Sequence, residues 1–380
     1  MNRIPDLVIF LLLLFFTSCN NGNIKKPDVT SNNQFKFNAT VTDTINITLN
    51  GKLSNWLFEQ YLLNDSTLYI LDIFNSPKCI YIININKRKI TDSICIKKDF
   101  MINNRITNIY VHNKDSILCI ENYPAHIMLI NNKGEIIKNI NFKSITKNDS
   151  LFSPYLGNEF GINNISYYDS RISNLYVTLI PNGSADFMGD TGFYRQAIFN
   201  LKTDSWELFY GKYRGILKKK GERIYFYEMH NPYSLILNKK NYVSYPIDNY
   251  IYCYSIDNGI LLDSIYFSGK TPLKFPDPLQ PNSSDDKLRK LMKKSPFYGP
   301  LTYHNSKKLF SRYTFQRNKK SYLYIYDENF KFVTQISLDI DKFYTLIPSN
   351  FGFYSIPKIN NSSDENILKL FRVELTKIKN

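Results

Sequence analysis

The sequence contains few of the residues and motifs that usually mark an enzyme. It has 4 histidines and 5 cysteines in 380 residues, and no two cysteines have CxxC spacing, which disfavours a zinc site. The G-x-S-x-G, H-E-x-x-H, P-loop and Rossmann glycine patterns are all missing. The sequence therefore predicts no catalytic residues, no metal site and no cofactor.

Long apolar runs are also scarce, and the one near the N-terminus is short. It extends from Leu7 to Phe16, which is about half of the ~20 residues that a membrane-spanning helix needs. A run of this length behind a basic residue is typical of a secretory signal peptide.

The sequence Phe16-Thr17-Ser18-Cys19 resembles a bacterial lipobox. The resemblance implies that residues 1–18 are removed as a signal peptide and that Cys19 is acylated; cleavage without lipid is the alternative. Asn20 is not the Asp that retains such lipoproteins at the inner membrane, and residues 20–26 lack an acidic export cluster. We therefore expect an outer-membrane lipoprotein on the periplasmic face, with surface exposure left open. The polar residues 19–34 are interpreted as a flexible tether.

The formal net charge is +15, and it stays at +15 without residues 1–18 because Arg3 and Asp6 cancel. Such a charge could favour anionic lipid, acidic glycan or nucleic acid. Asn, Ile, Lys and Tyr are abundant throughout, however, as an AT-rich coding sequence would produce. No basic run is interleaved with aromatics, and the signal peptide directs the chain out of the cytoplasm. We expect membrane attachment through the N-terminal lipid and no nucleic acid partner.

Apolar runs of strand length, separated by turn residues, recur roughly every 45 to 50 residues, beginning with Ser66–Ile96. A repeat of this length built only of strands is typical of the four-stranded blade of a β-propeller. Both faces of runs such as Leu68–Leu71 are apolar, as expected where neighbouring sheets cover them. The pattern predicts an all-β fold: one β-propeller domain over residues 35–380, with six blades of four antiparallel strands.

The blades can be assigned from the runs, and the last blade is one strand short. We predict that Thr44–Leu49, at the other end of the chain, completes it and closes the ring, which hides two sheet edges. The predicted blades are Trp56–Ile96, Ile106–Asn141, Ile165–Phe209, Tyr233–Phe267, Leu301–Leu338 and Phe343–Val373.

Two cysteines have the spacing of cross-strand partners. A tight turn near Arg88 would place Cys79 and Cys95 opposite each other on neighbouring strands, where an oxidising compartment allows a disulfide. A register shift of one residue would put them on opposite faces, so free thiols are the alternative. Cys119 and Cys253 lie in apolar runs and are expected to act as small hydrophobic residues.

Three features together carry a family resemblance. They are Cys19, the strand repeat with cores such as Leu68-Tyr69-Ile70, and the aromatic hairpin Tyr322–Asp327. With them the chain resembles the uncharacterised Bacteroidota lipoproteins that have a propeller-like fold, of the domain of unknown function 4221 type. This resemblance implies a fold and a compartment, but it provides no catalytic residue.

The long connections of the predicted fold all fall on one face, because connections alternate sides within an antiparallel blade. One of them contains Ser284–Lys294, a helix candidate with acids at its start and lysines at its end. Since binding groups concentrate on long loops, we predict a surface for an anionic or polar ligand here. Its expected residues are Tyr123, Asp186, Asp190, Arg195, Lys290, Lys293, Lys294 and Arg317. The alternatives are a solvated face without a partner, and ordinary loop acids at Asp186 and Asp190.

Two functions remain open at this point. The first is a monomeric envelope lipoprotein whose propeller binds a protein or a glycan. The alternative is a propeller-type hydrolase or lyase with its site at the central channel, which would need converging His, Asp or Glu side chains. His112 and His304 are expected in solvent-exposed turns, and His126 at the start of a strand.

Overall fold

The structure is a computed structural model, and in the part of the chain that it describes β-strand is by far the main regular structure. Among the described residues, no helix has the length and apolar character needed to cross a membrane. The described residues are 35–49, 58–72, 77–96, 106–122, 125–141, 152–155, 167–169, 173–181, 194–212, 232–267, 273–277, 279, 283–315, 321–339, 345–357 and 367–379.

Three sheets each contain four antiparallel strands in chain order. The first is β6 (Ile106–Asn113), β7 (Ser116–Asn122), β8 (Ala125–Ile130) and β9 (Ile136–Asn141). The second is β15 (Tyr233–Leu237), β16 (Lys240–Ser244), β17 (Tyr250–Ser255) and β18 (Leu261–Tyr266). The third is β19 (Phe297–His304), β20 (Leu309–Phe315), β21 (Ser321–Asp327) and β22 (Phe332–Leu338).

A fourth sheet has a first strand in two pieces. Both β10 (Phe152–Tyr155) and β11 (Tyr167–Asp169) pair with β12 (Asn174–Pro181), β10 near its C-terminal end and β11 near its N-terminal end. The sheet continues through β13 (Tyr194–Asn200) and β14 (Ser205–Lys212). The predicted long connection before this sheet therefore contains a short strand that the sequence pattern did not reveal.

The two ends of the described chain meet in the remaining sheet, which has eight strands. Its order is β2-β3-β4-β5-β1-β25-β24-β23. One half is β2 (Phe58–Asn64), β3 (Thr67–Asp72), β4 (Lys78–Asn84) and β5 (Lys89–Ile96). The other half is β23 (Thr345–Pro348), β24 (Gly352–Ile356), β25 (Ile367–Lys379) and β1 (Phe35–Thr48).

The N-terminal strand pairs with the C-terminal strand, as the missing strand of the last repeat predicted. β1 and β25 are antiparallel from Phe35↔Lys379 to Thr48↔Ile367, with one irregularity between Val41 and Asp43. Among the described residues, the strand pairing between the two halves of this sheet is the parallel pair Thr48↔Lys89 of β1 and β5. Backbone pairing along β1 therefore connects the start of the described chain to its end.

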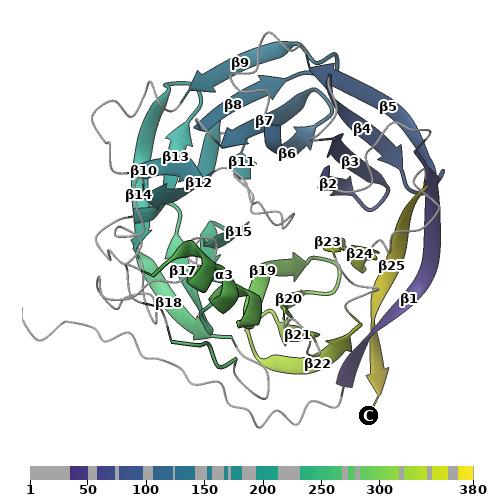
Figure 1. Ribbon diagram of the computed structural model, residues 1–380, viewed down its shortest axis with the longest axis vertical. Coiled ribbons are helices and arrows are strands. Elements are labelled where there is room, and N and C mark those ends of the chain that lie inside the picture. Colours follow the sequence, from purple (N-terminus) through teal and green to yellow (C-terminus); the bar gives the residue numbers. More distant parts are fainter. Residues whose placement is uncertain are drawn as a thin grey trace, which may run out of the picture.

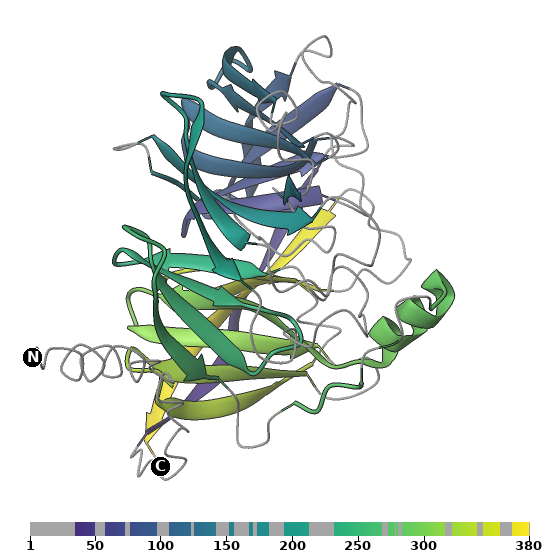
Figure 2. The same ribbon diagram turned by 90° about the vertical axis from the view of Figure 1, so that its left-hand side faces the viewer.

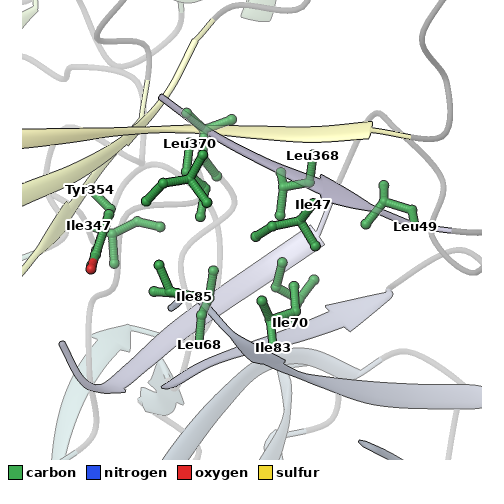
Figure 3. Close-up of a cluster of buried hydrophobic side chains, with 12 residues drawn as sticks. Ile47, Leu49, Leu68, Ile70, Ile83, Ile85, Ile347, Tyr354, Leu368 and Leu370 are labelled. Atoms are coloured by element: carbon green, nitrogen blue, oxygen red, sulfur yellow. The ribbon is translucent and has the colours of Figure 1, made fainter. Parts of the chain in front are cut away.

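The sheets lie around a ring, and the strands labelled toward its centre are β2, β6, β11, β15, β19 and β23 (Figure 1). Six hydrophobic clusters are found among the described residues, and each combines side chains from two sheets or half-sheets that are neighbours around the ring. Figure 3 shows the cluster in which Ile47 and Leu49 of the N-terminal segment meet Leu68, Ile70 and Ile83. Because both faces of these sheets are covered, their central strands are apolar on both sides.

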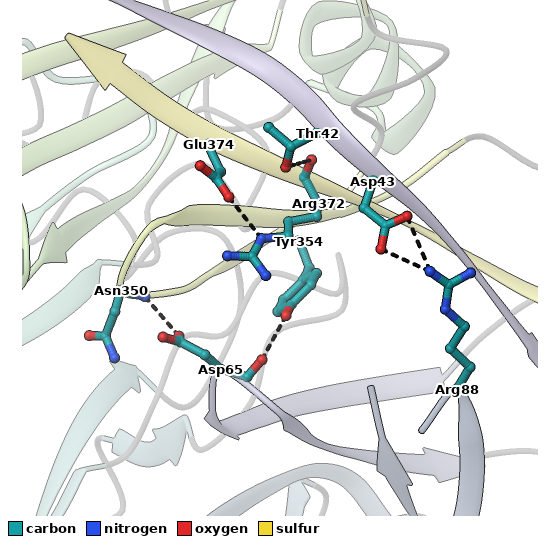
Figure 4. Close-up of polar contacts among 8 residues, drawn as sticks. All are labelled: Thr42, Asp43, Asp65, Arg88, Asn350, Tyr354, Arg372 and Glu374. Atoms are coloured by element: carbon teal, nitrogen blue, oxygen red, sulfur yellow. Dashed lines mark hydrogen bonds and ion pairs between the residues drawn. The ribbon is translucent and has the colours of Figure 1, made fainter. Parts of the chain in front are cut away.

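Polar contacts support the same junction between the ends of the chain (Figure 4). The Arg88 guanidinium lies 3.1 Å from the Asp43 carboxylate, which links β5 to β1. The Tyr354 hydroxyl donates to the backbone oxygen of Asp65 at 2.6 Å, and the Asn350 amide donates to the Asp65 carboxylate at 3.0 Å. The exposed ion pair is worth about 0–1 kcal/mol, so apolar burial and strand pairing carry most of the closure.

A disulfide links the two neighbouring strands β4 and β5. Cys79 and Cys95 are direct register partners and their sulfur atoms are bonded, with a sequence separation of 16. Closing a loop of this size removes conformational freedom from the unfolded chain and contributes about 3 kcal/mol in the chain-entropy model. Cys119 and Cys253 are free and buried, and burial raises the pKa of the Cys119 thiol.

The strand directions define two faces of the ring. The turns that join first to second strands and third to fourth strands lie on one face, which we call the turn face; its described turns are 65–66, 85–88, 114–115, 131–135, 201–204, 238–239, 256–260, 305–308, 328–331 and 349–351. The opposite face, which we call the α3 face, carries the helix α3 (Asp285–Lys294) between β18 and β19. Figure 2 shows α3 projecting on one side, with the C-terminal end of β25 on the other.

Candidate functional site

The sequence predicted a binding surface on the face that carries α3. Lys290, Lys293 and Lys294 are on α3 and are exposed. Arg195 lies in β13. The remaining predicted residues, Tyr123, Asp186, Asp190, Arg317 and the lipid-attachment residue Cys19, lie outside the described residues.

The prediction for Arg195 differs from the structure. This side chain is only 1% exposed, so it does not contribute to an open binding surface. Residues 195–199 of β13 are all buried because neighbouring strands and sheets cover both faces of this strand. Arg195 was predicted as a binding residue because it follows one of the long connections, but the position of β13 inside its sheet buries the side chain.

The helix α3 forms where the sequence predicted it and ends in a defined way. Basic side chains occupy its last turn, where they complement the negative end of the helix dipole. Ser295 follows the helix, and both its amide and its hydroxyl donate to the carbonyl of Leu291. The partly buried Leu291 side chain packs against the hydrophobic cluster that contains Tyr245, Ile247 and Tyr252. One side of α3 is thereby held on the ring.

The other side of α3 presents basic groups to solvent. Its ten residues include five basic and two acidic ones. The described exposed side chains of the helix are Asp286, Lys287, Arg289, Lys290, Lys293 and Lys294. Ammonium and guanidinium groups clustered on one ordered element can bind carboxylate, phosphate or sulfate groups. This is the chemistry that the helix offers to a partner.

A buried turn supports the place where α3 sits. Arg312 of β20 is fully buried, and its guanidinium donates to the carbonyl oxygens of Gly299 at 3.0 Å, Asp248 at 3.2 Å and Tyr245 at 2.6 Å. The guanidinium carbon also lies 4.2 Å from the centre of the Tyr298 ring. Arg312 therefore fastens the turn between β16 and β17 to the next sheet around the ring.

The electrostatics of this turn follow from its burial. Burial raises the pKa of Asp248 to about 6, although the Tyr252 hydroxyl, backbone amides and Arg312 favour its ionised form. The Tyr252 hydroxyl donates to the Asp248 carboxylate at 2.8 Å. Burial also lowers the pKa of Arg312 to about 10, so the guanidinium remains charged at neutral pH. The negative carboxylate and the positive guanidinium partly offset each other's cost of burial.

Further buried ionisable side chains lie at the ends of the middle strands on the α3 face. Glu121 and His126 are each 1% exposed, and the His126 Nδ1 atom lies 2.9 Å from the Glu121 carboxylate. The Nε2 atom of His126 contacts the side-chain oxygen of Asn139. Asp72 and Lys78 occupy the corresponding strand ends of the adjacent half-sheet and are also buried. The sequence pattern did not identify these pairs, because each lies within or beside an apolar run.

His304, at the end of β19, also differs from the sequence prediction. His304 was expected in solvent, but it is fully buried, and its Nδ1 atom lies 3.1 Å from the carbonyl oxygen of Ser349. A carbonyl can only accept, so Nδ1 carries the proton and Nε2 accepts from the Ser311 hydroxyl at 2.8 Å. Burial lowers the pKa of His304 to about 4, which keeps it neutral at physiological pH.

The other histidine that was expected in a solvent-exposed turn, His112, is half-buried. Among the described residues, no group of three or more His, Cys, Asp or Glu could hold a metal ion.

The fold thus defines the class of protein: a ring of mainly antiparallel β-sheets with a basic helix on one face. The chain belongs to the DUF4221 family, a domain of unknown function, whose family model matches residues 36–334. The family predicted from the sequence is therefore confirmed.

Two solved structures from Bacteroides are similar to this chain. A member of the DUF4221 family from Bacteroides vulgatus is 14% identical, covers 91% of this chain and 100% of its own, and has a TM-score of 0.64. A protein from Bacteroides fragilis is 13% identical, covers 89% of this chain and 95% of its own, and has a TM-score of 0.53. No curated protein matches the chain. At these identities the likeness shows the fold alone.

Proposed function

We propose that this DUF4221 protein is an outer-membrane lipoprotein, acylated at Cys19 and facing the periplasm, whose β-propeller binds an anionic protein or glycan partner at the α3 face. The N-terminal sequence supports the anchor, because a ten-residue apolar run precedes Cys19 and is too short to span a membrane. Acyl chains contribute about 0.8 kcal/mol per buried CH₂ group, so multiple chains on one cysteine would hold the protein at the membrane.

Six blades are the arrangement that best accounts for the sheets. The strands fall into six sets of four along the ring when the eight-stranded sheet is divided at its single parallel pair and β10 with β11 is taken as one strand. Each of the six clusters fills the space between two neighbouring sets. In this arrangement residues 35–380 form one domain, closed by β1.

The single observation that carries the binding proposal is the arrangement of α3. The helix packs the partly buried Leu291 against the ring and exposes five basic side chains. An ordered helix loses less conformational freedom on binding than a loop does. A basic helix projecting from one face would therefore bind an acidic surface of a protein or an acidic glycan.

Charge reversal on α3 tests this proposal. The α3 variant carries Lys290→Glu, Lys293→Glu and Lys294→Glu, and the matched control, the turn variant, carries Lys87→Glu, Lys202→Glu and Lys307→Glu on the turn face. Each favourable charge contact contributes about 0.2–1 kcal/mol, and reversal replaces three attractions with repulsions, so we expect the α3 variant to lose roughly tenfold in affinity. Quantitative pull-down of envelope components by the purified proteins measures the loss.

The turn variant should recover the same envelope proteins and glycans as the wild type. Both variants change the net charge equally, so a general effect of charge would weaken them to the same degree. Equal recovery by the α3 variant and the wild type, or equal losses in the two variants, would refute the binding site on α3.

A further inference from the structure

The described chain starts and ends on the turn face, opposite α3. β1 begins at Phe35 and β25 ends at Lys379, and these two residues are register partners. The end of β25 lies on the opposite side of the ring from α3 in Figure 2. A membrane anchor at the N-terminus would therefore be connected to the ring at its turn face.

The length of the preceding segment limits how far the ring can be from such an attachment. Fifteen residues separate Cys19 from Phe35. They reach at most about 55 Å even if fully extended. A lipid on Cys19 would therefore keep the turn face within reach of the lipid headgroups.

The turn face is basic and its basic groups come from all around the ring. Its described turns contain nine basic and six acidic residues. The nine basic residues are all exposed: Lys87, Arg88, Lys114, Lys133, Lys202, Lys239, Lys307, Lys308 and Lys331. A Lys or Arg close to an anionic bilayer contributes about 1 kcal/mol to the attraction, so a face with this distribution favours an anionic lipid surface.

Several acids of the turn face already have partners within the protein. The Asp204 carboxylate lies 2.8 Å from the Lys138 ammonium, and the Asp65 carboxylate accepts a hydrogen bond from the Asn350 amide. The Glu135 carboxylate accepts from the Asn131 side chain at 2.7 Å. The basic residues of the turn face are exposed, although Arg88 lies 3.1 Å from Asp43 and Lys239 lies 3.9 Å from Asp257. The turn face therefore carries an excess of basic side chains, nine against six acidic ones.

We infer that the turn face lies against an anionic lipid surface and that α3 points away from it. This inference rests on the proposed acylation of Cys19, which places the bilayer on the side where β1 begins. The lysines of the turns fix the tilt of the ring by binding lipid phosphates at several points. The α3 face is then directed into the aqueous compartment, where a partner can reach it.

Hydrogen–deuterium exchange on membranes tests the orientation. The full acylated protein is reconstituted into vesicles of phosphatidylcholine, with or without phosphatidylglycerol. We expect slower deuterium uptake in peptides covering 85–88, 201–204 and 305–308 on the vesicles that contain phosphatidylglycerol, and no change in the peptide covering α3. The turn variant should lose this protection, and the α3 variant should keep it. High salt should also abolish it, because the Debye length falls to about 3 Å at 1 M.

The outcomes separate this inference from the proposed anchor. Mass spectrometry of the same sample reports whether Cys19 carries acyl chains. An acylated protein that shows equal uptake at the turns on both vesicle types, or protection at α3 instead, overturns the inference and leaves the anchor intact. A protein without acyl mass that is still protected at the turns overturns the anchor and supports the turn face as a lipid-binding surface.

Discussion

A chain that begins at residue 50 is expected not to fold cooperatively, whereas a chain that begins at residue 35 is expected to melt like the full protein. The shorter chain loses β1, whose 13 register pairs with β25 join the two ends of the molecule. It also loses the side chains of Ile45, Ile47 and Leu49, which are at most 3% exposed. Burying each of these three side chains contributes about 1.5–3 kcal/mol. Their sum approaches the free energy of unfolding of a typical domain, which is about 5–15 kcal/mol.

Circular dichroism and differential scanning calorimetry of the two truncated chains measure this difference. A single substitution in β1 tests the same contribution to stability on a smaller scale. Ile47→Ala should lower the free energy of unfolding by about 2–5 kcal/mol, while Asn46→Ala, at the exposed neighbouring position, should change it by less than about 0.5 kcal/mol. A chain beginning at residue 50 with the same melting transition as the chain beginning at residue 35 would refute closure by β1.

Replacing Arg312 by Met is expected to destabilise the protein by about 3–5 kcal/mol, because the loss of a buried charge leaves its partners unsatisfied. Three carbonyl oxygens, those of Tyr245, Asp248 and Gly299, would lose their donor. A loss of this size lowers the melting temperature by on the order of 5–10 °C in a chain of this length. Lys290→Met, at an exposed position on α3, is the matched control and should have little effect.

The Arg312 variant should also change the pH dependence of stability. Arg312 lowers the pKa of Asp248 in the folded protein, so its removal should raise that pKa further above its value in the unfolded chain. A carboxyl with a raised pKa in the folded state costs stability as pH rises through that pKa. The destabilisation should therefore be larger at pH 8 than at pH 5. A deficit that is the same at both pH values would show that Asp248 and Arg312 are not coupled.

The strands, the helix and the closure were predictable because they depend on local patterns. Apolar runs bounded by turn residues indicated most strands, and the charge order of Ser284–Lys294 indicated α3. The pairing of β1 followed from a last repeat that lacked one strand. The facing positions of Cys79 and Cys95 followed from the turn between β4 and β5, and the structure places them as direct partners.

The strand β10 and the full length of β1 escaped prediction for local reasons. Phe152–Tyr155 contains a proline, which usually counts against a strand and is tolerated at a sheet edge. The prediction for β1 began at Thr44, but the strand begins at Phe35, because Phe37 and Ala39 also pack against the cluster next to β22.

The buried polar contacts could not be predicted because their partners are distant in the sequence. Arg312 binds carbonyls that lie up to 67 residues earlier in the chain, and His304 binds Ser349 on another strand set. A polar residue within a strand looks the same in the sequence whether it meets solvent or a neighbouring sheet. Only the position of each strand in the ring decides which occurs.

Site-specific photo-cross-linking in intact cells tests the assignment of the two faces most directly. A photoreactive amino acid replaces either Lys290 on α3 or Lys307 on the turn face, one at a time, in the full acylated protein. We predict that the probe at position 290 cross-links to a protein or glycan partner and that the probe at position 307 cross-links to lipid. A macromolecular partner captured from position 307 but not from position 290 would contradict both the binding site on α3 and the membrane orientation of the ring.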